Sequence, residues 1–228
     1  MYKLFLTAAL IAVTLNGHSQ KTETRDIESF DKISAFGSLE IYLEKGNKES
    51  LKLESETVDL NDITVKSEGK TLKISVTEKI LSSHREVKVT ITYKELRGII
   101  VKGGAEIFDT TEISGDKLEI TAGSGSTLNL KLNLNTLQIS VGQGADVTFE
   151  GKCKSQEIET STGGLYNAYY LNCDSTYVKS NTGGLAKVSA IEYLNASAST
   201  GGQISYKGEP KIKKENTSLG GSIEKVQE

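Results

Sequence analysis

The chain has 228 residues, of which 36% are hydrophobic and 25% are charged, and its formal net charge is −3. This length predicts one or two domains, and the composition is typical of a globular protein that buries a core. Lysines and arginines are scattered among acidic residues, whereas a nucleic-acid-binding surface needs clustered basic residues, so we expect no nucleic-acid partner. Two histidines and two cysteines leave little material for metal or imidazole chemistry, and we expect no cofactor and no metal.

Residues 1–19 are typical of an export signal. Lys3 gives a short positive start, and the apolar stretch 4–15 that follows is too short to span roughly 30 Å of membrane hydrocarbon. Gly17 and Ser19 are small residues at the positions that a signal peptidase inspects, so we expect cleavage after residue 19. A buried N-terminal strand or helix is the alternative, and the polar residues directly after the stretch disfavour it. We therefore expect an exported protein of the periplasm, the outer-membrane surface or the extracellular medium, with no transmembrane segment in the mature chain.

Residues 26–95 are predicted to form a series of short strands. The segment 36–46 alternates strictly between apolar and polar side chains, and shorter segments of the same kind follow at 51–53, 63–65, 72–76 and 87–93. Alternation with a period of two is the pattern of a strand that buries one face. Turn residues between these segments favour several antiparallel pairs. No flexible linker follows, so we expect residues 20–228 to form a single domain.

Paired or near-paired glycines recur seven times through residues 96–226. The second members of the pairs are Gly104, Gly125, Gly144, Gly164, Gly184, Gly202 and Gly221. Successive steps between them are 18 to 21 residues, and short alternating segments lie on both sides of each pair. Leucine-rich repeats share this period, but their consensus is missing. The repeat therefore predicts an all-β fold, a parallel β-helix (β-solenoid) with coils of about 20 residues stacked about 4.8 Å apart. We expect it to be right-handed because parallel crossovers usually are.

Glycine has a physical reason to recur at the corners of such a coil. A sharp corner needs a residue with positive φ, which glycine adopts without a Cβ clash. We expect the second glycine of each pair to occupy this corner, so Gly164→Val should impair folding.

The two cysteines test the proposed stacking. Cys153 lies nine residues after Gly144, and Cys173 lies nine residues after Gly164. Equivalent positions on adjacent coils are about 5 Å apart, which is within reach of a disulfide, and an exported protein meets an oxidising compartment. We predict a Cys153–Cys173 disulfide, with two buried free thiols as the alternative. The same counting places Glu159 beside Lys179 and aligns Glu119, Gln138, Glu157 and Tyr177 in one outward column.

The alternating segment 36–46, the strand 72–76 and the later Ser-Thr-Gly-Gly pairs together resemble the family described as "Putative auto-transporter adhesin, head GIN domain". This resemblance covers roughly residues 26–226, nearly the whole mature chain. The members of the family are exported proteins of Gram-negative bacteria. It implies an all-β, β-helix-like fold and a cell-envelope or secreted location. It implies no catalytic residues that could be carried over to this sequence.

Little in the sequence points to catalysis. His84 is the one histidine of the mature chain and lies in a polar segment typical of a loop. Glu157 and Glu159 project to the same side of a predicted strand, and two carboxyl groups facing one cleft are what glycoside cleavage requires. A carbohydrate-active enzyme, either a polysaccharide lyase or a hydrolase, is therefore an alternative to a non-enzymatic protein, and a structural envelope protein with no ligand is a further one.

Tyrosines gather late in the chain and give the better indication of binding. They are Tyr166, Tyr169, Tyr170, Tyr177, Tyr193 and Tyr206. Exposed tyrosines on a rigid sheet stack on sugar rings or anchor a protein partner, although such residues also pack between coils. Tyr177 is the best candidate for exposure, and Tyr169 and Tyr170 are further candidate binding residues. Tyr193 lies nine residues after Gly184 and is expected to be structural. We expect adhesin-like binding of a protein or glycan surface.

Overall fold

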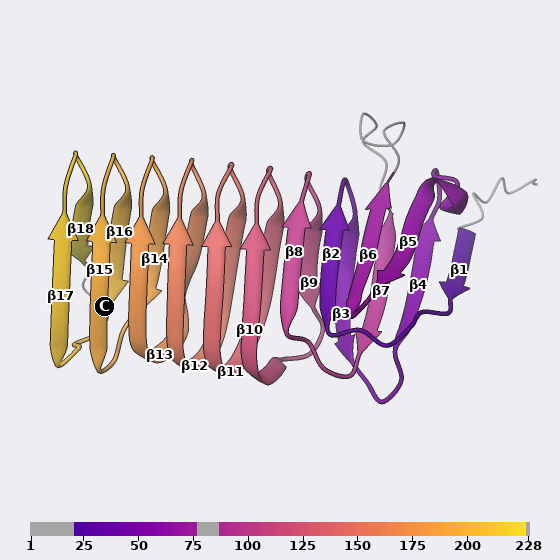
Figure 1. Cartoon of the computed structure of the whole chain (residues 1–228), viewed down its shortest axis with the longest axis horizontal. Coiled ribbons are helices and arrows are strands. Elements are labelled where there is room, and N and C mark those ends of the chain that lie inside the picture. Colours follow the sequence, from indigo (N-terminus) through magenta and orange to yellow (C-terminus); the bar gives the residue numbers. More distant parts are fainter. Residues whose placement is uncertain (1–20, 77–86, 227–228) are drawn as a thin grey trace, which may run out of the picture.

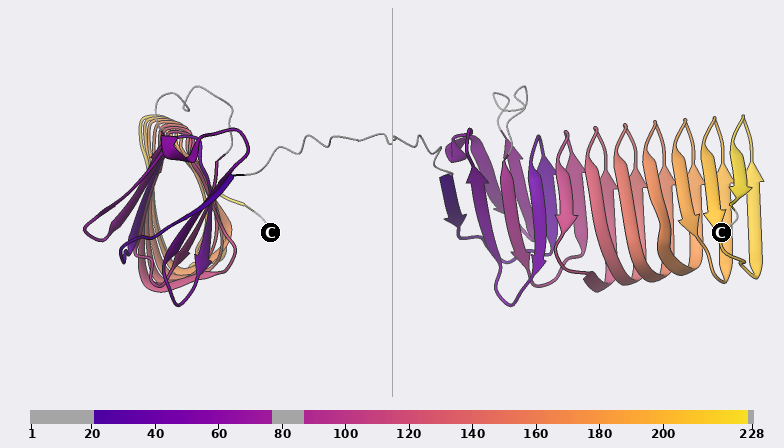
Figure 2. Two further views of the ribbon diagram at one scale, coloured as in Figure 1. Left: turned by 90° about the vertical axis from the view of Figure 1, so that its right-hand side faces the viewer. Right: turned by 180° about the vertical axis from the view of Figure 1, so that it is seen from behind.

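The computed structural model describes residues 21–76 and 87–226, so the predicted export signal and His84 lie outside the described residues. Every strand in these two ranges belongs to one 18-stranded sheet. The sheet winds into a flattened tube whose coils are stacked along the long axis (Figures 1 and 2). Among the described residues, no helix is long and apolar enough to cross a membrane.

In its described residues, the N-terminal section has nine strands and one 3₁₀ turn. They are β1 (Lys21–Arg25), β2 (Lys32–Phe36), β3 (Glu40–Lys45), β4 (Ser50–Ser55), η1 (Leu60–Asp62), β5 (Ile63–Glu68), β6 (Thr71–Val76), β7 (Lys88–Tyr93), β8 (Gly98–Lys102) and β9 (Glu106–Asp109). Antiparallel pairing occurs in three places here, between β1 and β4, β4 and β7, and β5 and β6. The predicted mixture of parallel and antiparallel strands is confirmed.

The solenoid coils follow, and all of their strands pair in parallel. The strands are β10 (Ile113–Ala122), β11 (Thr127–Val141), β12 (Asp146–Thr160), β13 (Leu165–Ser180), β14 (Leu185–Ser189), β15 (Tyr193–Ala198), β16 (Gln203–Lys207), β17 (Ile212–Thr217) and β18 (Ser222–Lys225). Strands β11, β12 and β13 each continue around one edge of the tube, so each contributes to both faces (Figure 2). The β-solenoid predicted from the glycine repeat is confirmed.

The register of the coils confirms the predicted columns. Cys153 pairs with Cys173 at a Cα–Cα distance of 4.6 Å, and their sulfur atoms form a disulfide. Glu159 lies opposite Lys179 in the same pair of strands. The predicted outward column is also observed, with successive pairing of Glu119, Gln138, Glu157 and Tyr177 on neighbouring strands.

Alternation with a period of two fills the interior of the tube. Inward positions of successive coils carry Ile139, Ile158 and Val178, while the strand residues on either side of each of them point to solvent. One continuous cluster of buried residues extends from Phe30 in the N-terminal section to Tyr206 in the last coils. The hydrophobic effect therefore acts along the whole length of the tube.

The N-terminal strands are stacked out of chain order. Strands β2 and β3 form a coil of their own, because β2 lies between β6 and β8 and β3 lies between β7 and β9, all in parallel. The corner between β2 and β3 contains Gly37 at φ 96°, whose backbone N–H donates to the Lys102 carbonyl at 3.2 Å. The first coil is thus inserted beside β8 and β9, and β4 to β7 extend the tube beyond it (Figure 1).

The corner glycines need a correction of one residue in the later coils. Positive φ occurs at the second glycine in Gly104, Gly125 and Gly144, as predicted, but at Gly163 and not at Gly164. The same applies to the following coils, where the positive-φ glycines are Gly183, Gly201 and Gly220, not Gly184, Gly202 and Gly221. The residue before each of these glycines also has positive φ, as at Thr162 (48°), so the corners are turns with two left-handed residues.

The second glycines of the later pairs are required for a different reason. A Cβ atom built at Gly164 would lie 2.4 Å from the Val141 carbonyl oxygen, and one built at Gly202 would lie 2.2 Å from the Ser180 carbonyl oxygen. Both Cβ atoms would clash with the backbone of the preceding coil, and no movement of a side chain could remove the clash. Here glycine permits close stacking of the coils, whereas its neighbour permits the turn.

Candidate functional site

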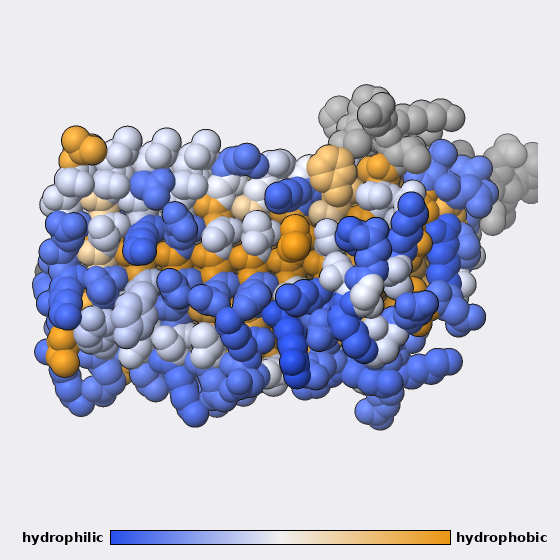
Figure 3. All heavy atoms as spheres, viewed as in Figure 1, coloured by the Kyte–Doolittle hydropathy of each residue, from blue (hydrophilic) through white to orange (hydrophobic). Residues whose placement is uncertain are grey.

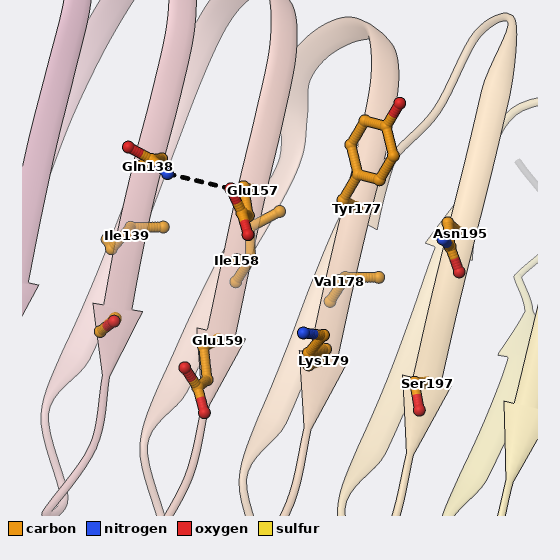
Figure 4. Close-up of a pocket in the computed structure, with 11 residues that line it drawn as sticks. Gln138, Ile139, Glu157, Ile158, Glu159, Tyr177, Val178, Lys179, Asn195 and Ser197 are labelled. Carbon is orange, nitrogen blue, oxygen red and sulfur yellow. Dashed lines mark hydrogen bonds between the residues drawn. The ribbon is translucent and has the colours of Figure 1, made fainter.

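A shallow groove lies on the face that is formed by β8, β10, β11, β12, β13 and β15. Two outward rows of side chains bound it, and they run along the axis of the tube (Figure 4). The first row consists of Gly98, Glu119, Gln138, Glu157, Tyr177 and Asn195. The second row consists of Ile100, Thr121, Ser140, Glu159, Lys179 and Ser197. We call the space between them the axial groove.

The floor of the axial groove is the residue column between the two rows. Ile139, Ile158 and Val178 occupy this column and are 4%, 1% and 1% exposed. Their side chains point into the core, so they present mainly their backbone to the groove (Figure 4). In the space-filling view the column is a continuous hydrophobic stripe between polar rows (Figure 3).

A pair of tyrosines forms an aromatic shelf beside the C-terminal part of the axial groove, where Tyr177 belongs to the first row. The ring centroids of Tyr177 and Tyr193 are 5.2 Å apart with an interplanar angle of 40°. Lys214 on the next coil places its ammonium nitrogen 5.9 Å from the Tyr193 ring centroid, within the range of a cation–π contact. Tyr177 is 42% exposed, so part of its ring is available to a ligand. We call Tyr177 and Tyr193 the tyrosine shelf.

Tyr193 is placed differently from the prediction. It pairs with Ser175 and not with Cys173, and it is half-buried against Tyr177. The count from Gly184 fails because the coil of β14 and β15 is two residues shorter than that of β13: Asn167 pairs with Lys187, 20 residues later, whereas Ser175 pairs with Tyr193, 18 residues later. For the cysteines, the glycine offset of one residue and the one-residue β-bulge opposite Thr148 and Glu150 cancel.

The polar side chains of the axial groove differ in how they are held. The Gln138 amide nitrogen donates to a carboxylate oxygen of Glu157 at 3.0 Å, which fixes both groups across two coils. Glu159 lies beside Lys179 in the second row. Asn195 and Ser197 are shorter and leave the end below the tyrosine shelf open (Figure 4). The groove can therefore both donate and accept hydrogen bonds.

A buried polar network supports the strands beneath the axial groove. Gln156 is fully buried; its amide nitrogen donates to the Thr176 hydroxyl at 3.0 Å and to the Ser189 carbonyl at 3.1 Å. The Tyr166 hydroxyl donates to the Gln156 amide oxygen at 2.9 Å. Fully satisfied networks of this kind rigidify a core. Alternation predicts that Gln156 points inward, but the partners of its amide come from two other strands, β13 and β14, and leave no local signal in the sequence.

A second aromatic cluster lies on the other face, at the β-bulge of β13. The bulge adds one residue opposite β12 and places Tyr169 and Tyr170 next to each other at the surface. The Lys207 ammonium nitrogen lies 5.1 Å from the Tyr169 ring centroid and 5.5 Å from that of Tyr170. Tyr170 is 74% exposed, and burial raises the pKa of the half-buried Tyr169. We call these three residues the bulge cluster.

The late tyrosines thus divide between core and surface. Tyr166 and Tyr206 are buried, at 0% and 2% exposed, and belong to the core. The predicted binding candidates Tyr177 and Tyr170 are exposed, and Tyr169 is half-buried. No group of three or more metal-ligating side chains occurs within residues 21–76 and 87–226.

The family described as "Putative auto-transporter adhesin, head GIN domain" matches residues 29–210, which is most of the chain. The chain belongs to this family. Membership in the head GIN family agrees with the order of motifs read from the sequence, from the alternating segment near residue 36 to the last Thr-Gly-Gly. The family is named for adhesion and not for catalysis. No curated protein matches the sequence.

Solved structures share the fold of this head GIN domain protein. A "putative adhesin" from Bacteroides fragilis NCTC 9343 has a TM-score of 0.82 at 23% identity, covering 91% of this chain and 97% of that one. A "putative adhesin" from Parabacteroides merdae ATCC 43184 has a TM-score of 0.66 at 18% identity, with 93% and 98% covered. A "putative lipid binding protein" from Parabacteroides distasonis ATCC 8503 has a TM-score of 0.66 at 20% identity, with 93% and 98% covered. At these identities the likeness establishes the fold alone.

Proposed function

We propose that this head GIN domain protein is a non-enzymatic, exported, adhesin-like protein of the cell envelope or cell surface, and that it binds a glycan or protein surface through exposed tyrosines. The observation that carries the proposal is the tyrosine shelf beside a polar groove. Tyrosine on a rigid sheet gives a large contact area at a small loss of side-chain entropy, and its ring face stacks on sugar rings. The family name supports adhesion, and the short apolar stretch at residues 4–15 supports export.

The bulge cluster gives a second contact on the other face. Lys207 has no ion-pair partner among the described residues, so its charge is available to an acidic group of a bound surface. A molecule with aromatic contacts on both faces can bind two separate elements of a cell surface, which strengthens attachment through multivalency.

The test compares alanine variants of the exposed tyrosines. Tyr177→Ala is expected to weaken binding to a printed array of surface glycans and to fixed epithelial cells by about fivefold, because a stacked aromatic contact contributes about 1 kcal/mol. Tyr170→Ala is expected to weaken cell binding as well. Tyr42→Ala is the control, since Tyr42 lies in the N-terminal section and packs on Phe108 at a centroid distance of 5.6 Å. Binding equal to that of the unmodified protein for both surface variants would contradict the proposal.

One observation favours a second function, that of a carbohydrate-active enzyme. Glu157 and Glu159 lie in opposite rows of the axial groove, so their carboxylates flank any chain bound between the rows (Figure 4). Glycoside hydrolysis uses two carboxyl groups placed on either side of the scissile bond. New reducing ends or unsaturated sugars, produced from a polysaccharide panel and lost in Glu159→Gln, would replace the binding proposal with this one.

A further inference from the structure

The axial groove is continuous over several coils. It comprises two adjoining cavities of about 310 Å³ and 290 Å³, and both are lined by Gln138, Ile139 and Ser140. It passes over six neighbouring strands from β8 to β15, and five steps at the usual strand spacing of about 4.8 Å give a length of roughly 24 Å. A ligand that fills the groove is therefore elongated and lies parallel to the long axis of the tube.

The floor of the groove disfavours a peptide strand as the ligand. A bound peptide strand needs a sheet edge with free backbone groups. The floor strands β10, β11, β12, β13 and β15 are hydrogen-bonded to neighbours on both sides, so their backbone groups are already paired. A protein partner would have to bind through side chains alone.

The walls of the groove disfavour an acyl chain and favour a hydroxyl-rich ligand. The central side chains of the rows carry amide, carboxylate, hydroxyl and ammonium groups at Gln138, Glu157, Ser140, Glu159 and Lys179. An acyl chain would leave these groups desolvated and unpaired, which is unfavourable. A sugar chain has hydroxyl groups along both edges, and these can pair with both rows.

The charges of the groove favour a neutral ligand. Acidic groups are contributed by Glu119, Glu157 and Glu159, and basic groups by Lys32 and Lys179. A polyanion would meet carboxylates in both rows, and like charges disfavour such a complex. The aromatic ring in the first row, that of Tyr177, suits an uncharged sugar face.

We propose that the axial groove binds an unbranched, uncharged glycan chain parallel to the long axis of the protein, with successive sugar rings over successive coils and one ring stacked on Tyr177. An extended sugar ring is similar in length to the spacing of the coils, so from β10 to β15 each row offers a polar side chain to each ring. This inference rests on the proposed function and adds to it the shape, the charge and the direction of the ligand.

The first experiment measures affinity as a function of chain length. Isothermal titration uses neutral, linear series from disaccharide to octasaccharide, made of cello-, xylo- and chito-oligosaccharides, with oligouronates as the charged comparison. The expected result is that at least one neutral series binds about tenfold more tightly as a pentasaccharide than as a disaccharide, with little gain beyond a hexasaccharide. The oligouronates are expected to bind more weakly at every length.

A blocked groove gives the decisive comparison. Ser140 is exposed and lies where the two cavities join, so Ser140→Trp fills the middle of the groove. The pentasaccharide is then expected to bind only as tightly as the disaccharide, while the disaccharide keeps its affinity for the tyrosine shelf. Asn129→Trp is the matched control, because Asn129 is exposed on the same strand but on the other face. That variant should bind both lengths as the unmodified protein does.

The outcomes separate this inference from the proposed function. Two results would contradict a glycan chain bound along the axial groove but would still support adhesion. One is binding that depends on Tyr177 but not on chain length. The other is binding of every chain length that is unchanged in Ser140→Trp. Tighter binding of oligouronates than of the neutral series would overturn the uncharged ligand. Loss of all binding on the glycan array and on cells would overturn both proposals.

Discussion

Two polar side chains lie at the ends of strands that flank β3 in the N-terminal section. Tyr93 is 1% exposed, and its hydroxyl group has no hydrogen-bond partner among the described residues. Asp109 is half-buried, and one carboxylate oxygen accepts a hydrogen bond from the Lys131 backbone N–H at 3.1 Å. Burial raises the pKa of Tyr93 to about 12, with a smaller contribution from the charge of Asp109. Burial also raises the pKa of the Asp109 carboxyl above its usual value of 3.8.

The raised pKa of Asp109 predicts how stability changes with pH. The folded state holds the proton of Asp109 more tightly than the unfolded chain, so protonation of this carboxyl contributes to the stability of the fold. The contribution is fully present below about pH 3.8 and is lost as the pH rises through the raised pKa. Asp109→Asn removes the dependence while an amide oxygen can still accept from Lys131. The free energy of unfolding of the unmodified protein should therefore fall relative to that of Asp109→Asn between about pH 4 and pH 7. Urea unfolding at several pH values measures this, with Asp146→Asn as a control for the lost charge; a constant difference would contradict the assignment.

At the scale of the element, the corner turns show that adjacent glycines have different tasks. Gly163 has φ 69°, and a Cβ atom there would meet nothing within 4 Å. Gly164 lacks positive φ, but a Cβ atom there would lie 2.4 Å from a backbone oxygen of the coil below. The first glycine therefore relieves local backbone strain, and the second permits stacking.

These roles predict unequal effects of alanine. Gly163→Ala should lower the free energy of unfolding by about 1 kcal/mol, because an alanine in a left-handed conformation is strained by about that amount. Gly164→Ala should lower it by about 3 kcal/mol or more, because the backbones of two coils must move apart. Thermal unfolding of the two variants makes the comparison, and both keep the same composition. Equal losses, or a larger loss for Gly163→Ala, would contradict the division of roles.

The elements also show how far the sequence predicts the structure. Periodic glycines and alternation predict the solenoid, the column of Glu157 and Tyr177 and the disulfide, because each depends on the repeat length alone. The position of Tyr193 depends on a shortening of the coil by two residues between β14 and β15, which no local pattern marks. The insertion of β2 and β3 beside β8 depends on long-range pairing, and the axial groove depends on two rows that meet only after folding. The alternation of inward and outward residues predicts that Tyr177 is exposed. It does not predict that Tyr177 contacts Tyr193.

At the scale of the whole molecule, the last coil closes the end of a tube that could otherwise continue. Inward positions of β15 carry Leu194 and Ala196, but the equivalent positions of β17 carry Lys213 and Glu215. The Lys213 ammonium donates to the Tyr206 hydroxyl at 3.1 Å and lies 3.3 Å from a Glu215 carboxylate oxygen. Charged residues at inward positions of an edge strand prevent further strands from adding to it. Core and sheet are continuous up to this end, which favours a single domain, and that organisation stays a prediction.

A hydrophobic last coil is expected to make the protein associate end to end. Lys213→Leu with Glu215→Val restores apolar residues at the inward positions of β17, whose outer backbone edge pairs with no strand among the described residues. Hydrophobic burial and strand pairing would then both favour addition of a second molecule. Sedimentation velocity over a range of concentrations should show association for this double variant. It should show none for Lys214→Leu with Asn216→Val, which adds the same side chains at the outward positions of β17. If both double variants associate, surface hydrophobicity is the cause of association. If neither associates, Lys213 and Glu215 are not the residues that prevent further strands from adding to β17.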